Sequence, residues 1–92
     1  MGYEVRLTKG AKKDLDRIPD HVARKFDAWR EQVEVEGLPA VQKVPGFHDE
    51  PLKGQRKGQR SIRLSRGYRA IYTKFENEIV LVLVEEVNKH EY

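Results

Sequence analysis

Residues 61–84 read SIRLSRGYRAIYTKFENEIVLVLV and contain the strongest strand signals in the chain. Apolar and polar residues alternate over residues 61–65, which is the period of a strand with one buried face. Gly67 provides a turn and residues 68–75 are rich in β-forming types, so the two segments predict an antiparallel hairpin. Residues 79–84 are apolar without alternation, which predicts a central strand covered on both faces.

The N-terminal part of the chain carries a different pattern. Residues 3–7 alternate between apolar and charged types and predict a first strand. Apolar residues then recur with helical spacing over residues 9–18 and 21–36, which predicts two helices in a hairpin. Proline and glycine make residues 37–58 a predicted loop with at most one turn. These elements predict an α+β fold in which an N-terminal strand and a helical hairpin accompany a mostly antiparallel four-stranded sheet.

Length and composition limit the classes of protein. Ninety-two residues without cysteine predict a single domain spanning residues 1–92, with no disulfide and no thiolate metal site. The longest apolar run is far shorter than a membrane span, and the N-terminus lacks an apolar secretion signal, so we expect a cytoplasmic protein that does not bind membranes. His48, Asp49 and Glu50 have no partner cluster of metal ligands, so we expect no metal and no cofactor.

Basic residues are concentrated between residues 51 and 75, where no acidic residue occurs, although the formal net charge of the whole chain is only +3. They fall on a glycine-containing loop and the two strands after it, so folding should gather them on one surface that attracts a polyanion such as a phosphate backbone. A merely solubilising surface is the alternative, but such surfaces usually mix both signs of charge. The candidate RNA-binding or phosphate-binding residues are Lys53, Arg56, Lys57, Arg60, Arg63 and Arg66.

Candidate proton-transfer groups flank this basic window. Glu50 lies directly before it and is held near it by Pro51, where a carboxylate can accept a proton from a nucleophile. The alternative for Glu50 is a structural salt bridge with a nearby lysine or arginine. His90 and Tyr92 follow the apolar strand and should emerge beside Arg69, although chain ends are usually solvated and without function.

Strand parity separates the two arginines of the predicted hairpin. Arg63 points away from Ile62 and Leu64, whereas Arg69 shares the parity of Ile71. Arg69 therefore needs either a bulge or a partly open face of the sheet to reach a substrate.

Four short segments together resemble the RelE/ParE superfamily of bacterial toxins. They are EPLKG at residues 50–54, SIRL at 61–64, GYRAIY at 67–72 and HEY at 90–92, following a strand and a helical hairpin. Within the superfamily the chain is most similar to the RelE, YoeB and HigB type mRNA interferases, which inhibit translation by cutting mRNA in the ribosomal A site. The resemblance implies a RelE-like fold, a type II toxin-antitoxin system, and three partners: mRNA, the 70S ribosome with its 16S rRNA, and a cognate antitoxin.

The resemblance also implies roles for individual residues. In several relatives the residue before Pro-Leu-Lys-Gly is a Glu or His that acts as general base, which implies this role for Glu50. The arginine of the Gly-Tyr-Arg hairpin binds the scissile phosphate, which points to Arg69. A histidine or tyrosine at the C-terminal end protonates the leaving group or orients the substrate. That feature points to His90 and Tyr92, and which of the two is the general acid stays open.

A consistent chemistry for these residues is metal-independent endonucleolytic cleavage of RNA. A base deprotonates the 2′-hydroxyl, which attacks the adjacent phosphorus, while Arg69 and then Arg63 or Arg66 stabilise the developing charge. The products are a 2′,3′-cyclic phosphate and a 5′-hydroxyl. Two alternatives stand beside this hydrolase: a ParE-like toxin that inhibits DNA gyrase by binding alone, and a non-catalytic RNA-binding module, which would need neither Glu50 nor His90.

Overall fold

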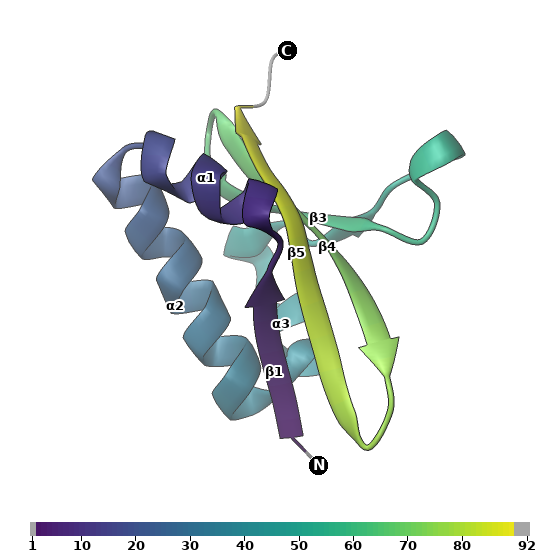
Figure 1. Cartoon of the computed structure of the whole chain (residues 1–92). Helices are drawn as coiled ribbons and strands as arrows, with labels where there is room; N and C mark the ends of the chain where they lie inside the picture. The colour runs from purple at the N-terminus through teal and green to yellow at the C-terminus, as the bar shows by residue number, and fades with distance from the viewer. Residues whose placement is uncertain (1, 90–92) are drawn as a thin grey trace.

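A computed structural model describes residues 2–89, so His90 and Tyr92 lie outside the described residues. One sheet runs through the molecule in the order β1-β5-β4-β3-β2 (Figure 1). β1 runs parallel to β5, and the other neighbouring strands are antiparallel. The predicted α+β architecture is confirmed, with a fifth short strand in addition to the four expected. The strands are β1 (Gly2–Leu7), β2 (Glu50–Pro51), β3 (Arg60–Ser65), β4 (Tyr68–Glu76) and β5 (Ile79–Lys89).

The two long helices form where they were predicted. α1 spans Lys9–Arg17 and begins at Thr8, whose hydroxyl accepts a hydrogen bond from the Ala11 amide. α2 spans Asp20–Glu36 and ends at Gly37, which has a φ of +89°. No helix among residues 2–89 combines the length and the apolar character needed to cross a bilayer.

The segment after α2 contains more regular structure than predicted. α3 (Leu38–Gln42) forms there because Leu38 and Val41 are buried on one side of it, and because proline is tolerated in the first turn of a helix. Two 3₁₀ turns (Pro45–Phe47 and Gly54–Arg56) and the short β2 follow. The prediction of a mostly irregular loop over residues 37–58 was therefore wrong.

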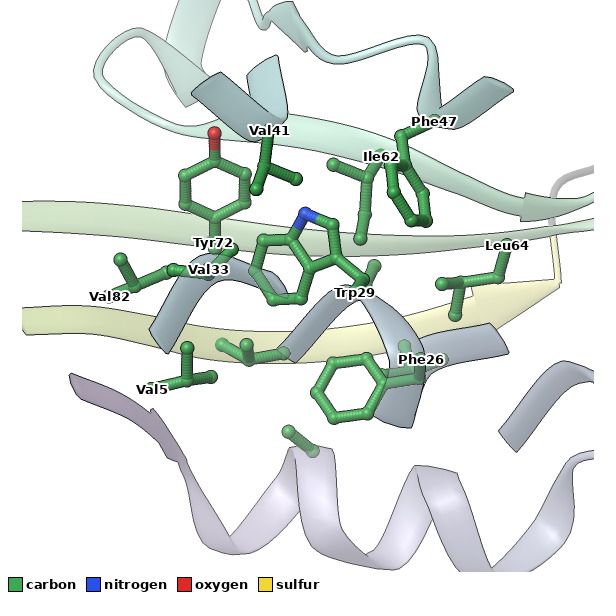
Figure 2. Packing of buried hydrophobic residues seen from close by; sticks show 14 of the residues in the cluster. Val5, Phe26, Trp29, Val33, Val41, Phe47, Ile62, Leu64, Tyr72 and Val82 are labelled. Carbon is green, nitrogen blue, oxygen red and sulfur yellow. The ribbon is translucent and has the colours of Figure 1, made fainter. Parts of the chain in front are cut away.

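The hydrophobic core lies between the sheet and the helices α1, α2 and α3. Trp29 is fully buried at its centre, with its ring centroid 5.8 Å from that of Phe26 and 5.4 Å from that of Tyr72 (Figure 2). Offset and tilted aromatic contacts at this spacing add to the stability that burial supplies. Val5 and Val82 continue the same layer across β1 and β5.

β5 is buried on one face only. Val80, Val82 and Val84 are buried, whereas the alternate residues Leu81 and Leu83 are only half-buried. The expectation of a strand covered on both faces was therefore wrong. In the view of Figure 1, α2 lies to the left of β1 and α3 lies behind β1 and β5. An apolar run shows that a strand is central, but it does not show how many layers cover it.

α1 takes the place of a neighbouring strand beside the second half of β5. β1 ends at its pairing of Leu7 with Val84, and the chain turns there into α1. The Thr8 hydroxyl then donates to the Glu85 carbonyl at 2.9 Å, and the Val87 amide donates to the Asp14 carboxylate at 2.9 Å. These bonds hold the edge of β5 at the level where β4 carries Arg69.

Side chains of α2 bond the outer edge of β1 in a similar way. The Val5 amide donates to the Glu34 carboxylate at 3.1 Å, and the Val5 carbonyl accepts from the Arg30 guanidinium at 2.9 Å. Glu34 and Arg30 are four residues apart and so lie on the same side of the helix. Both backbone groups of Val5 are therefore satisfied at the margin of the sheet.

Candidate functional site

Cross-strand pairing brings several charged residues to one face of β2, β3 and β4. Paired residues of antiparallel strands lie on the same face, and Arg63 pairs with Arg69. Their neighbours Ile62 and Ala70 also pair and are buried in the core, so the two arginines lie on the opposite side of the sheet. Glu50 reaches the same side by pairing with Ser61. We call this side, which carries Glu50, Ser61, Arg63, Arg69, Ile71 and Glu86, the open face, although Ser61 itself is buried.

The parity question raised by the sequence is settled by this arrangement. Arg69 does share its face with Ile71, but Ile71 is only half-buried, and the core is formed by Ala70 and Tyr72 instead. Arg69 thus reaches the open face without a bulge of its own. Its side chain is 21% exposed, which is enough for a ligand to touch it while the neighbouring strands hold its stem.

Glu50 is the carboxylate that faces these arginines most directly. Its Oε1 lies 3.4 Å from Arg69 NH1, and its Oε2 lies 3.4 Å from His48 Nε2. Both distances are at the long end for polar contacts, and the Glu50 side chain is 42% exposed. The contact with Arg69 can therefore be exchanged for a ligand.

Arg63 offers a hydrogen-bond donor that the described residues do not use. Its Nε is buried and has no hydrogen-bond partner among residues 2–89. Buried polar atoms of this kind are uncommon in folded proteins, and this one lies on the strand next to Arg69. The pairing places two guanidinium side chains on the same face of neighbouring strands.

A bulge in β5 adds carboxylates that the basic window did not predict. Ile71 pairs with Glu86 and the next residue, Tyr72, pairs with Val84, so Glu85 is an extra residue without a partner on β4. Glu85 accepts hydrogen bonds from Gln59 at 2.7 Å and from Thr73. The part of this face beside β5 is therefore acidic.

Arg56 is partly neutralised by this acidic edge. Its NH1 lies 3.0 Å from Glu86 Oε2, and it also donates to Gln59. The hydrogen bond from Arg56, with a second from Asn88, lowers the pKa of Glu86, and the same contact with Glu86 raises the pKa of Arg56. Without RNA, Arg56 is therefore paired with Glu86. A phosphate would have to displace the Glu86 carboxylate to bind Arg56.

Arg60 is not brought to the open face. It pairs with Tyr72 in the ladder, and its Nε lies 2.6 Å from the Asp49 carboxylate, whose side chain is only 1% exposed. The Tyr72 hydroxyl donates to the other Asp49 oxygen and accepts a hydrogen bond from Gln42 at 3.1 Å. We call these four residues, Gln42, Asp49, Arg60 and Tyr72, the buried polar network.

The network shifts the ionisation of two of its members. Burial, together with the hydrogen bond to Asp49, raises the pKa of the Tyr72 hydroxyl far above its usual range. Burial by itself would lower the pKa of Arg60, but the hydrogen bond and charge of Asp49 outweigh it and raise that pKa. Tyr72 therefore stays a donor and Arg60 stays a cation, and both serve the packing of β2 against β3 and β4.

The remaining predicted cations lie at the margin of the site. Lys53 and Lys57 are exposed around the 3₁₀ turn between β2 and β3, where Gly54 and Gly58 have φ values of +66° and +100°. Arg66 is exposed at the turn between β3 and β4. His90 and Tyr92 lie outside the described residues, but Asn88 pairs with Arg69 and Lys89 pairs with Tyr68. The described chain thus ends next to Arg69.

His48 joins the site, although the sequence offered it only as a metal ligand without a partner cluster. Among residues 2–89 it is the one residue other than glycine with a positive φ, and its backbone is left-handed at φ 46° and ψ 52°. Its imidazole Nε2 lies 3.4 Å from Glu50 Oε2. The nearest available signal in the sequence was its position two residues before the candidate base.

Solved structures of bacterial and archaeal toxins share this fold. The DinJ-YafQ toxin-antitoxin complex from E. coli matches with a TM-score of 0.73 and 20% identity, covering 98% of this chain and 94% of the other. The YoeB/ParE toxin from Agrobacterium tumefaciens matches with a TM-score of 0.72 and 18% identity, covering 96% and 99%. The archaeal RelE-RelB complex from Pyrococcus horikoshii OT3 gives 0.67 and 23%, covering 97% and 96%. At these identities the likeness establishes the fold.

Sequence comparison identifies the family. No curated protein sequence matches the chain. A family model described as the ParE toxin of the type II toxin-antitoxin system parDE matches residues 5–91, which is nearly the whole chain. The chain therefore belongs to the ParE toxin family of type II toxin-antitoxin systems, within the RelE/ParE superfamily.

Proposed function

We propose that this toxin is a metal-independent endoribonuclease that cleaves mRNA. The observation that carries the proposal is the contact between the Glu50 carboxylate and the Arg69 guanidinium on an open, strand-supported face. A carboxylate that can accept a proton thus lies beside a guanidinium that can bind phosphate. Arg63, paired with Arg69 across the strands, supplies the second guanidinium.

The reaction begins when a phosphodiester of the RNA binds to Arg69 and Arg63. Glu50 then releases Arg69 and accepts the proton of the adjacent 2′-hydroxyl, whose oxygen attacks the phosphorus. The guanidiniums stabilise the negative charge that accumulates on the pentavalent phosphorus group more than they stabilise the starting diester. The bond to the 5′-oxygen breaks, and this oxygen takes a proton from His90 or Tyr92. The products are a 2′,3′-cyclic phosphate and a 5′-hydroxyl.

The proposed partners follow from the family. Several related structures are toxin-antitoxin complexes, among them DinJ-YafQ, RelE-RelB and YoeB-YefM. We propose by this likeness that a cognate antitoxin binds this chain, and that mRNA is cut in the A site of the 70S ribosome, next to 16S rRNA. The exposed Lys53, Lys57 and Arg66 would contact phosphates around the scissile group. Cytoplasmic residence is part of the same proposal.

The decisive test combines Glu50→Gln and Arg69→Ala with two controls on the protein surface. Each substitution should lower the rate of cleavage of ribosome-bound mRNA by roughly 100-fold or more, which is the usual effect of removing a general base or an electrostatic donor. Arg69→Ala should also weaken RNA binding and its dependence on salt, while antitoxin binding is kept. The control variants Glu78→Gln and Arg24→Ala change exposed residues and should cleave like the unaltered toxin. Unchanged cleavage in both site variants contradicts the proposal.

A second candidate function is inhibition of DNA gyrase by binding alone. The match to the ParE family model favours it, since ParE-like toxins act in this way by the resemblance described above. The same variants separate the two functions. If growth arrest persists in Glu50→Gln and Arg69→Ala and purified gyrase is inhibited, the gyrase function holds and the ribonuclease proposal is wrong.

A further inference from the structure

We infer that His48 is a positioning residue that keeps the Glu50 carboxylate in place during RNA cleavage, an inference that rests on the proposed function. The two oxygens of Glu50 have different partners, because Oε1 lies near Arg69 and Oε2 lies near His48 Nε2, each at 3.4 Å. A bound phosphate takes over the Arg69 guanidinium. His48 is then the group among the described residues that still contacts the carboxylate and orients its free oxygen toward the 2′-hydroxyl.

The backbone around His48 is fixed on both sides. Phe47 before it is buried in the core, and its ring lies under the Lys25 ammonium at 5.0 Å. Asp49 after it is held in the buried polar network by Arg60. The His48 amide also donates to the Pro45 carbonyl at 3.1 Å. His48 therefore has little freedom to relax.

The left-handed backbone conformation of His48 is energetically unfavourable, and the anchors on both sides of it maintain it. Residues other than glycine avoid that region, and histidine, asparagine and aspartate enter it more readily than most. Strained backbone of this kind tends to occur at functional sites, where neighbouring anchors hold it. The imidazole that this backbone carries lies 3.4 Å from the Glu50 carboxylate. The His48 side chain is 54% exposed, so its contribution to the core is small.

The inference makes His48 act through Glu50 and not on the RNA. Removing the imidazole should leave binding of RNA nearly unchanged, because Arg69 and Arg63 still hold the phosphate. The chemical step should slow, because the carboxylate can swing away from the 2′-hydroxyl, and misplacement of a reacting group by about 1 Å can cost roughly 100-fold in rate. Any side chain that places a hydrogen-bond donor where Nε2 lies should restore the orientation.

The experiment compares His48→Gly and His48→Gln by single-turnover cleavage of ribosome-bound mRNA. His48→Gly also relieves the backbone, so the protein should fold at least as stably, and thermal unfolding checks this. We expect His48→Gly to cleave about 10- to 100-fold more slowly at saturating RNA, with an unchanged Kd for RNA. His48→Gln, whose amide nitrogen reaches about as far as Nε2, should recover most of the lost rate. His21→Gln changes an exposed histidine on α2 and is the matched control.

Combining the change with Glu50→Gln separates this inference from the proposed function. In the Glu50→Gln background, His48→Gly should cause no further loss, because two residues that act through one group are not additive. The inference is overturned if His48→Gly cleaves normally, if its loss lies in Kd, if glutamine performs no better than glycine, or if the two losses multiply. Normal cleavage by Glu50→Gln alone would instead overturn the ribonuclease proposal itself.

Discussion

Asp49 and Glu50 are adjacent carboxylates with opposite surroundings. Asp49 faces the covered side of the sheet, where its side chain is 1% exposed and bonded to Arg60 and Tyr72. Glu50 faces the open side, where its side chain is 42% exposed and touches Arg69 at 3.4 Å. Because successive side chains of an extended chain point in opposite directions, these two neighbours face opposite sides of the sheet. One carboxylate is thus committed to stability and the other stays available for chemistry.

The contrast extends to the arginines that accompany them. Arg60 and Arg69 both come from the basic window, yet one completes a buried ion pair and the other faces ligands. A buried pair is costly to break, because its remaining member stays in a medium of low polarity. An open pair exchanges its partner at little cost. Charge alone therefore does not identify which cations of the window bind RNA.

The sharpest test of the contrast is the pair Asp49→Ala and Glu50→Ala. Removing Asp49 should lower the free energy of unfolding by about 3 kcal/mol, toward the lower end for buried pairs because Arg60 is one-third exposed and regains some water. Removing Glu50 should change that free energy by less than about 0.5 kcal/mol. Urea unfolding followed by tryptophan fluorescence measures both. Equal losses in the two variants would contradict the division of roles.

The raised pKa of Tyr72 provides a second, smaller test at high pH. An unfolded tyrosine ionises near pH 10, at a pH where the buried Tyr72 hydroxyl still keeps its proton. The contribution of Tyr72 is therefore complete below about pH 10 and declines as the pH rises further, because only the unfolded state releases the proton. Unfolding measured from pH 9 to 11 should show a steeper decline for the unaltered toxin than for Tyr72→Phe. Parallel curves would show that the hydroxyl is not protected by burial.

The smallest effect is expected for the ion pair at the acidic edge of the open face. Arg56 and Glu86 are in contact at 3.0 Å but remain partly exposed, so Glu86→Gln should cost less than about 1 kcal/mol. The lowered pKa of Glu86 means that this contribution exists at neutral pH and is lost as acid protonates the carboxylate. High salt should remove most of it, whereas the loss caused by Asp49→Ala should persist. A loss above about 2 kcal/mol that does not depend on salt would show that this pair behaves like the buried pair of Asp49 and Arg60.

Much of the fold followed from local patterns. The strand at residues 3–7, both long helices and the hairpin that carries Arg63 and Arg69 form where periodicity predicted them. β2 was missed because two residues are too few to show any period. The helix α3 was not predicted because glycine and proline over residues 37–39 indicate a loop, although proline fits a first helical turn.

The candidate site was predictable only in part. The grouping of Glu50, Arg63 and Arg69 depends on strand parity, which the sequence contains. The same parity places Arg60 on the side of Ile62 and Leu64, so its absence from the open face was predictable from the sequence. The bulge at Glu85 and the left-handed turn at His48 could not, because both arise from tertiary packing and leave no local composition signal.

The margin of the sheet at β1 has a consequence for assembly. Strands at an edge often recruit a strand from another molecule, which leads to swapped dimers or fibres. Here the amide and carbonyl of Val5 already bond Glu34 and Arg30. A foreign strand would have to displace both side chains before it could extend the sheet there, so α2 guards this toxin against aggregation at that edge.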